Sequence, residues 1–297
     1  MAWLQLRIDT DATQASTVEL ILDLLGATSI TFEDAANQPM YEPPLGTNPL
    51  WHLTRITALF DADTDQQQLI DQLTEQLQVQ TSKPEAPAYQ LQLIEDKAWQ
   101  TEWMKHIQPL RFGDNLWIVP EGFDTPEPDA VNLRFNPGLA FGTGSHPTTA
   151  LCLEWLSQQD LNNKTLIDYG CGSGILGIAA CMLGTRENHM VDIDTQALDS
   201  TRLNAQLNDQ SDKQIRCYLP ESFDNTQSDI LVANILATPL IENAEKFSTL
   251  VPSKGLLALS GILYDQIDSV RSAYEQWFDF EPPSLKEEWV LLKASRK

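Results

Sequence analysis

The chain has 297 residues, and its 19 lysine and arginine residues against 42 aspartate and glutamate residues give a formal net charge of −23. Proteins that bind nucleic acid contact phosphates with clustered cations, so this excess of acid excludes direct nucleic-acid binding from the expected functions. The length corresponds to about two domains of roughly 100 to 200 residues each, and a hydrophobic share of 42% excludes disordered, collagen-like and coiled-coil chains.

The sequence predicts a cytoplasmic protein without membrane contact. It contains no apolar run near the roughly 18 residues that a transmembrane helix needs, and its start, MAWLQLRIDT, lacks the apolar core of a signal peptide. The chain has four cysteines: Cys152, Cys171, Cys181 and Cys217. Because no two of them form a C-x-x-C pair, we expect reduced thiols and no bound metal.

Residues 1–95 alternate between the two-residue period of strands and the longer period of helices. Apolar and polar residues alternate, as in strands, at residues 4–8, 30–32, 56–60 and 89–93. Leucine, isoleucine and valine recur at helical spacing at residues 18–25 and 69–77. The resulting βαββαβ order is that of the split unit of ferredoxin-like α+β domains.

Residues 96–130 differ in character from the residues on either side. Trp99, Trp103 and Ile107 lie at helical spacing and predict a short amphipathic helix. The stretch EGFDTPEPDA that follows is acidic and contains two prolines, as connecting segments often do. We therefore expect a linker with one short helix.

Residues 131–297 alternate between strand and helix patterns. The strand candidates are TLIDYG, HMVDID, IRCYL and DILVANIL. Such alternation predicts a Rossmann-like α/β domain, in which a mostly parallel sheet has helices on both faces. The charged ending KEEWVLLKASRK predicts a further strand at the edge of this sheet.

Negative charge is densest at the start of the chain. Residues 1–95 contain 14 acidic and 3 basic residues, a net charge of −11, whereas residues 96–130 carry −4 and residues 131–297 carry −8. This distribution of charge has two interpretations: the acidic residues keep the surface soluble, or their electrostatic field attracts a basic partner.

The sequence DYGCGSG lies between an apolar strand and the helical run ILGIAACML. Gly170 permits a tight turn, and Gly172 and Gly174 let a ligand approach the backbone beside the unpaired N–H groups of the helix start. The glycine spacing also matches the G-x-G-x-x-G pattern of dinucleotide folds, which by itself does not identify the ligand.

Two acidic residues narrow the class of ligand. Asp168 ends the strand before the glycines, where its carboxylate favours a cation and repels a diphosphate; capping of the following helix is the alternative. Asp192 lies 22 residues after Gly170 at the end of the next strand, where an acidic side chain accepts hydrogen bonds from ribose hydroxyls. An adenosine derivative with an ammonium and a sulfonium group therefore fits better than a nicotinamide dinucleotide.

Two further motifs carry polar residues. Asn234 ends the apolar strand in DILVANILATPLI, where its amide either contacts a ligand or caps the next helix. The stretch PGLAFGTGSHPTT predicts a mobile loop that folds over a bound ligand, followed by the helix ALCLEWL. His146 in this loop predicts a hydrogen-bonding or positioning role, because no Ser-His-Asp or metal-ligand spacing accompanies it.

The motifs GLAFGTGSHPTT, DYGCGSG, VDID, NILATPL and LSGIL occur in this order, with SITFED in the first domain. Together they resemble the family of bacterial methyltransferases that modify protein eleven of the large ribosomal subunit. The resemblance implies a ferredoxin-like domain for substrate recognition over residues 1–95 and a linker over residues 96–130. It also implies a class I methyltransferase domain with a seven-stranded sheet over residues 131–297, which binds S-adenosyl-L-methionine.

The resemblance also implies roles for individual residues. It adds Thr149 to the cofactor contacts, which then comprise Thr149, Asp168, Gly170, Gly172, Asp192 and Asn234. It makes Phe141, His146 and Asn234 neighbours of the methyl group or the incoming amine, whereas no residue stands out as a general base. The implied reaction is methylation of lysine side chains and the N-terminal α-amine of a basic large-subunit ribosomal protein by a monomeric enzyme.

Three alternatives remain beside this reaction. A methyltransferase of the same fold that acts on another protein or a small molecule is the first, although a small molecule would not need the acidic domain. The others are a nicotinamide-dependent dehydrogenase and a noncatalytic ribosome-assembly factor that binds a protein partner.

Overall fold

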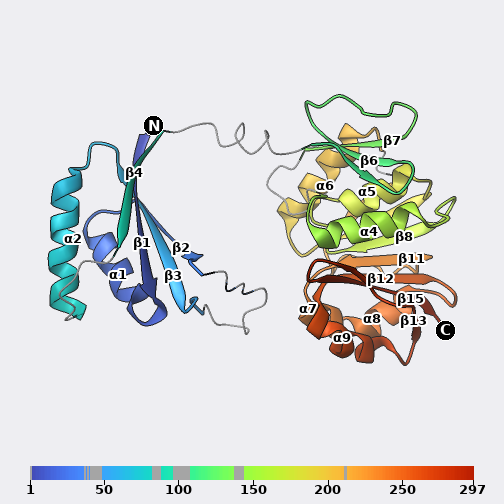
Figure 1. Cartoon of the computed structure of the whole chain (residues 1–297). Coiled ribbons are helices and arrows are strands. Elements are labelled where there is room, and N and C mark those ends of the chain that lie inside the picture. The colour runs from blue at the N-terminus through green and yellow to red at the C-terminus, as the bar shows by residue number, and fades with distance from the viewer. Residues whose placement is uncertain are drawn as a thin grey trace. The chain divides into compact units, whose positions relative to one another are not determined.

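The computed structural model describes residues 2–36, 38, 40, 49–81, 88–95, 108–136, 144–210 and 213–297. The chain divides into two compact units, Met1–His106 and Ile107–Lys297 (Figure 1). Within the described ranges, no helix is long and apolar enough to cross a membrane.

The first unit consists of one antiparallel sheet and two helices. The strands lie in the order β2-β3-β1-β4, and their bounds are β1 (Ala2–Asp11), β2 (Ser29–Asp34), β3 (Leu53–Asp61) and β4 (Tyr89–Glu95). The helices are α1 (Ala12–Leu24) and α2 (Gln66–Thr81), so the elements follow the βαββαβ order that the sequence predicts.

The core of the first unit comes from alternate residues of its strands and one stripe of each helix. It includes Leu4, Leu6, Ile8, Ile56, Ala58 and Phe60 from the strands and Val18, Ile21, Leu69 and Leu73 from the helices. The two-residue period places one face of each strand against the helices, because successive side chains of a strand point to opposite faces. Asp11 begins α1 by accepting hydrogen bonds from the backbone N–H groups of Thr13 and Gln14.

The second unit begins with a three-stranded sheet that corrects the predicted linker. Its strands are β5 (Leu110–Phe112), β6 (Leu116–Pro120) and β7 (Val131–Phe135), in the order β5-β6-β7. Phe112, Leu116 and Ile118 are buried in the core of this unit. The part of the expected linker that carries β5 and β6 is therefore a folded piece of the second unit. The helix predicted from Trp99 to Ile107 lies outside the described residues.

A large sheet forms the centre of the second unit. Its order is β10-β9-β8-β11-β12-β15-β13, and β14 pairs with β15. The strand bounds are β8 (Thr165–Tyr169), β9 (Glu187–Val191), β10 (Ile215–Tyr218), β11 (Ile230–Asn234), β12 (Leu256–Leu263), β13 (Phe278–Phe280), β14 (Ser284–Lys286) and β15 (Trp289–Arg296). The five strands from β10 to β12 are parallel, which confirms the mostly parallel sheet, and β14 adds an eighth strand to the expected seven.

Helices cover both faces of this sheet (Figure 1). One face carries α4 (Pro147–Ser157), α5 (Ile175–Met182) and α6 (Thr195–Leu207). The other carries α7 (Ala237–Glu242), α8 (Ala244–Leu250) and α9 (Ile267–Tyr274), and the short 3-10 helix η1 (Tyr264–Gln266) directly precedes α9. Two separate apolar cores result, one on each side of the sheet, as the near-continuous apolar strands require.

The C-terminal strand lies inside the sheet, so its prediction as an edge strand is wrong. β15 pairs with β12 on one side and with β13 and β14 on the other. Its residues Trp289–Leu292 are buried. This apolar run, rather than the charges that flank it, determines the position of the strand, because an interior strand is covered on both faces.

Candidate active site

The glycine loop (residues 170–174) connects β8 to α5 at the carboxyl end of the parallel sheet. Gly170 has a φ of 80°, which side chains disfavour, so the predicted tight turn is present. A Cβ atom at Gly170 would lie 2.2 Å from Cγ2 of Ile235. A Cβ atom at Gly174 would lie 2.8 Å from Cγ2 of Thr201, so this glycine allows α6 to pack against the loop. The φ of 82° at Gly174 also disfavours a side chain there.

Asp192, directly after β9, and two side chains of α6 hold the glycine loop. The carboxylate Oδ2 of Asp192 accepts a hydrogen bond of 2.8 Å from the backbone N–H of Gly172. From α6, Thr201 donates to the carbonyl of Gly172 over 3.0 Å, and Asn204 donates to the carbonyl of Ser173 over 3.0 Å. Sequence reasoning missed the two α6 residues. The sequence feature that could have indicated them is the spacing of Thr201 and Asn204, two polar residues three positions apart on the otherwise apolar face of α6.

Asp168 is buried beneath the loop, with 1% of its surface exposed. Its Oδ2 accepts a hydrogen bond of 3.0 Å from the backbone N–H of Gly177, in the first turn of α5, so the helix-capping alternative describes this contact. Its Oδ1 is buried without a partner among the described residues. The pKa of Asp168 is raised to about 7. Burial is the main cause, repulsion by Asp192 acts in the same direction, and the hydrogen bond from the Gly177 N–H acts against both.

Asp192 follows β9 and faces the glycine loop. Its Oδ1 accepts a hydrogen bond of 3.0 Å from the backbone N–H of Asp194, while its Oδ2 holds the N–H of Gly172. Asp194 has a different task, since its side chain caps α6 by accepting from the N–H of Gln196. An ionised carboxylate has about four acceptor positions. Asp192 therefore keeps acceptor capacity for hydroxyl groups of a ligand.

Asn234 and Thr149 meet although they are 85 positions apart in the chain. The side-chain amide of Asn234, at the end of β11, donates a hydrogen bond of 3.3 Å to Oγ1 of Thr149. The alternative role of Asn234 as a helix cap is wrong, because the N-cap of α7 is Leu236. Thr149 is buried in the first turn of α4, which starts at Pro147 rather than at Ala150 as expected. The contact fixes the start of α4 to the end of β11.

Ile235 is confined between two glycines. Its Cγ2 methyl occupies the space beside Gly170, and its carbonyl oxygen would lie 2.4 Å from a Cβ atom at Gly261. Gly261, in the LSGIL motif, has a φ of 84° and lies at the irregular step where β12 shifts register against β15. Gly261 thus lets the backbone of β12 lie close to the backbone of Ile235, and this contact holds the segment after Asn234 in place.

His146 caps the helix that carries Thr149. Its Nδ1 accepts from the backbone N–H of Thr148 over 3.4 Å and lies 2.8 Å from the Thr148 hydroxyl. The imidazole packs edge-on against Trp289, with ring centroids 5.0 Å apart. The structure therefore fixes the position of His146 through its neighbours. Phe141 lies outside the described residues.

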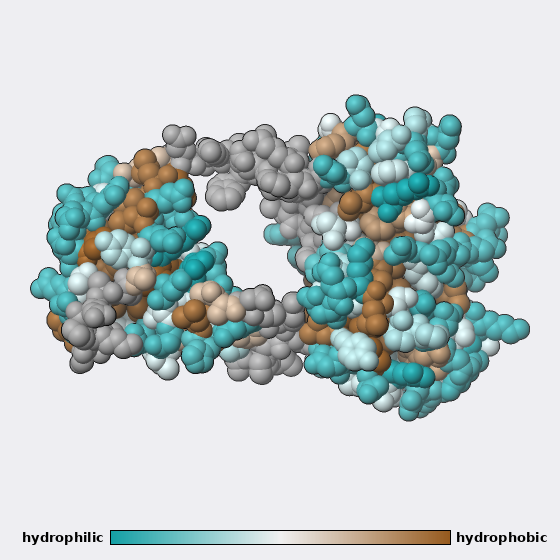
Figure 2. Space-filling model, viewed as in Figure 1, coloured by the Kyte–Doolittle hydropathy of each residue, from teal (hydrophilic) through white to brown (hydrophobic). Residues whose placement is uncertain are grey.

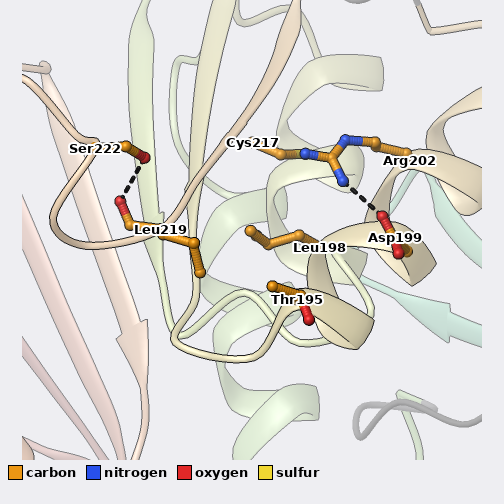
Figure 3. A pocket seen from close by; sticks show the side chains of 7 residues that line it. All are labelled: Thr195, Leu198, Asp199, Arg202, Cys217, Leu219 and Ser222. Atoms are coloured by element: carbon orange, nitrogen blue, oxygen red, sulfur yellow. Dashed lines mark hydrogen bonds and ion pairs between the residues drawn. The ribbon is translucent and has the colours of Figure 1, made fainter.

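A pocket of about 280 Å³ lies on another side of α6 (Figure 3). Its lining residues are Thr195, Leu198, Asp199, Arg202, Cys217, Leu219 and Ser222. Leu198 and Leu219 face each other across it, and Arg202 forms an ion pair of 2.7 Å with Asp199 at its rim (Figure 3). No predicted cofactor contact lines this pocket, so it is separate from the site around the glycine loop.

The charges around the glycine loop select the ligand class. The described side chains that bond to the loop and to the first turn of α5 are two acids, Asp168 and Asp192, and two neutral residues, Thr201 and Asn204. A diphosphate would meet two carboxylates here, and like charges repel. A cation that carries a ribose would meet the buried Oδ1 of Asp168 and the acceptors of Asp192.

Comparison with known proteins identifies the family. The family model described as "Ribosomal protein L11 methyltransferase (PrmA)" matches residues 2–297. Proteins named "Ribosomal protein L11 methyltransferase" from Pseudomonas putida (strain GB-1) and Marinobacter nauticus are 50% and 48% identical, over 100% of this chain and 100% and 99% of theirs. A solved structure titled as ribosomal protein L11 methylase from Lactobacillus delbrueckii subsp. bulgaricus has a TM-score of 0.59 and 30% identity, covering 64% of this chain and 100% of that chain. A match that spans both units, to relatives of the same length, shows that the chain belongs to the ribosomal protein L11 methyltransferase family.

Proposed function

We propose that the protein transfers methyl groups from S-adenosylmethionine to lysine side chains and the N-terminal α-amine of ribosomal protein L11. Family membership over residues 2–297 supports L11 as the substrate. The single observation that carries the donor assignment is the glycine loop held by Asp192 above the buried, half-satisfied carboxylate of Asp168. The enzyme acts as a monomer on a protein substrate and makes no contact with nucleic acid.

The residues at this end of the sheet fit the donor's functional groups. Asp192 accepts hydrogen bonds from the two ribose hydroxyls. The free oxygen of Asp168 binds the ammonium group, directly or through one water molecule, because a buried polar atom without a partner is unfavourable. Gly170 and Gly172 let the donor approach the backbone closely, and Thr149 and Asn234 border it from α4 and β11.

The remaining residues orient the incoming amine. When bound, S-adenosylmethionine supplies a methyl group that its sulfonium has already activated, so the protein's task is alignment in a site without water. A lysine has a pKa of about 10.4, so only about one in a thousand is neutral near pH 7. Burial next to a cation favours loss of the proton. Asn234 adds no charge there, and with His146 and Phe141 it positions the amine.

Exposed acids on the first unit support a role in substrate recognition. In the view of Figure 2, hydrophilic residues lie on both sides of a hydrophobic band on this unit. Its exposed acids include Asp9, Glu19, Asp23, Glu33, Asp61, Asp63, Asp65, Asp71 and Glu75. We infer that this surface attracts a basic ribosomal protein and brings its amines to the second unit, since opposite charge accelerates association.

Intact mass spectrometry of L11 tests the proposed function. The purified enzyme, incubated with S-adenosylmethionine and L11, should raise the mass of L11 in steps of one methyl group. Proteolytic mapping should then place these groups on lysine side chains and on the N-terminal amine. An unchanged mass, in a sample where L11 binds the protein, would favour the noncatalytic assembly factor, and methyl groups at other positions would contradict the lysine assignment.

The replacement Asp192→Ala should weaken donor binding without unfolding the protein. It removes the ribose acceptors and the anchor of the Gly172 N–H. Hydrogen bonds to a charged group contribute about 1.5 to 3 kcal/mol, which corresponds to a loss of affinity of roughly 10- to 150-fold in calorimetry. Asp194→Ala is the matched control, because it removes an acid two positions away that caps α6. Its loss should lower thermal stability and leave donor affinity unchanged; equal affinity losses in both variants would refute the ribose contact.

Donor affinity should depend on pH through Asp168. Its pKa in the protein is about 7, raised by burial, and the ionised form binds the donor's ammonium group better than the protonated form. Affinity should therefore rise as pH increases towards 7, by at most about tenfold per pH unit, and level off above it. Calorimetry across this range measures the effect. Asp168→Asn should bind weakly with little pH dependence, and a flat profile for the unmodified protein would contradict the contact.

A further inference from the structure

Two polar side chains of α6 and the one that ends the helix as its C-cap are buried on one face. Thr201, Asn204 and Asn208 are 0%, 2% and 8% exposed. Their spacing of three and four positions places them in one row along the helix. Buried polar groups need hydrogen-bond partners, so the identity of each partner indicates what the row does.

Asn204 bonds to two segments at once. Its Nδ2 donates to the carbonyl of Ser173 in the glycine loop over 3.0 Å, and its Oδ1 accepts from the backbone N–H of Asn136 over 3.2 Å. Asn136 directly follows β7. One amide group therefore joins the loop to the end of a strand in the other sheet of this unit.

Asn208 bonds to the same strand but not to the glycine loop. Its Oδ1 accepts from the N–H of Arg134 and its Nδ2 donates to the carbonyl of Arg134, each over 2.7 Å. The Nδ2 group also donates to the backbone carbonyl of Asn204 over 2.8 Å. Asn208 thus shares the residue type and the burial of Asn204 and lies one turn further along, at the C-cap of α6, but its side-chain hydrogen bonds to the described residues do not reach the loop.

The contacts of the row orient the backbone of the glycine loop. The carbonyl of Gly172 points to Thr201 and the carbonyl of Ser173 points to Asn204, while the N–H of Gly172 points to Asp192. The two carbonyl groups are thus directed towards buried side chains of α6, and the N–H group towards Asp192. A loop held in this way needs little ordering when a ligand binds, and preorganisation of this kind increases affinity.

We propose that Asn204, together with Thr201, is a positioning residue for the methyl donor. Asn204 does not itself touch the donor and acts through the glycine loop. It holds the carbonyl group of Ser173, and Thr201 holds the carbonyl group of Gly172. This inference rests on the donor site proposed above. It assigns a function to two residues of α6 that are not among the predicted cofactor contacts.

The test compares Asn204→Ala with Asn208→Ala in the full-length protein. Dissociation constants for S-adenosylmethionine come from calorimetry, and stability comes from thermal unfolding. We expect both variants to lose thermal stability, because each loses buried hydrogen bonds. Only Asn204→Ala should raise the dissociation constant, by about tenfold or more. Its KM for the donor should rise while kcat at saturating donor stays near that of the unmodified enzyme, a split that loss of stability alone does not produce.

The variant Thr201→Val provides a second, independent measurement. Valine has nearly the shape of threonine, and it removes the hydrogen bond to the carbonyl of Gly172 together with the 3.6 Å contact between the Thr201 hydroxyl and Sγ of Cys171, both in the glycine loop. It should raise the donor's dissociation constant in the same direction, and it decides the question if Asn204→Ala does not fold. Equal shifts in Asn204→Ala and Asn208→Ala, or no shift in Thr201→Val, would overturn the proposal. Failure of the unmodified protein to bind S-adenosylmethionine would instead contradict the donor site, and with it this inference.

Discussion

The replacement Gly170→Val is expected to reduce donor affinity by at least roughly 100-fold, about 2.7 kcal/mol. A Cβ atom at this position would lie 2.2 Å from Cγ2 of Ile235. The backbone of Ile235 passes close to Gly261, where an added Cβ atom would lie only 2.4 Å from its carbonyl oxygen. Valine at position 170 must therefore displace either the Ile235 side chain or the glycine loop, and we expect the backbone that the donor approaches to shift. The left-handed φ of 80° adds strain of about 1 to 2 kcal/mol for a residue with a side chain.

Gly122→Val separates the clash from the backbone strain. Gly122 has a φ of 89°, and no atom lies within 4 Å of the Cβ position. Its valine variant should lose stability and keep donor affinity in the same calorimetric titration. A smaller change at the site, Gly170→Ala, should regain part of its affinity when Ile235→Ala removes the opposing methyl group. Full activity of Gly170→Val would show that this turn does not shape the donor site.

Removal of residues 1–106 should abolish methylation of L11 and leave donor affinity nearly unchanged. The chain divides into two units at this point, and every proposed donor contact lies in the second unit. The first unit carries the densest negative charge and contains no residue of the proposed site. Titration of S-adenosylmethionine and methylation of L11, both on the same soluble truncated protein, measure the two effects.

A short peptide that contains a target lysine provides the control for this truncation. The full-length and truncated proteins should methylate the peptide at similar low rates, because neither uses the first unit to hold it. Methylation of intact L11 by the full-length protein should slow as salt increases, since charges on a surface are screened beyond about 10 Å at 0.1 M. A truncated protein that methylates L11 at the full-length rate would show that the first unit is not the recognition module.

The sequence alone determines the features that depend on neighbouring residues. The periods of apolar residues predict the βαββαβ order of the first unit and the parallel strands of the second, because each period reports which face of an element is buried. The turn at Gly170 follows from the glycine spacing, and the end of β9 directly before Asp192 follows from the strand pattern. The motifs that suggest the family are short continuous segments, so they too can be recognised from the sequence without knowledge of the fold.

Tertiary structure alone decides the features in which distant segments meet. The interior position of β15 depends on its pairing with β12, which lies well before it in the sequence. The hairpin of β5 and β6 is local, but only its pairing with β7 makes it part of the second unit.

The same holds at the site. Only the fold shows that Asp168 bonds to α5 with one oxygen and that the amide of Asn234 donates to Thr149. The contacts of Thr201 and Asn204 with the glycine loop depend on how closely α6 packs, which the lack of a side chain at Gly174 permits. A polar residue in a helix has many potential partners in sequence, and packing selects one of them.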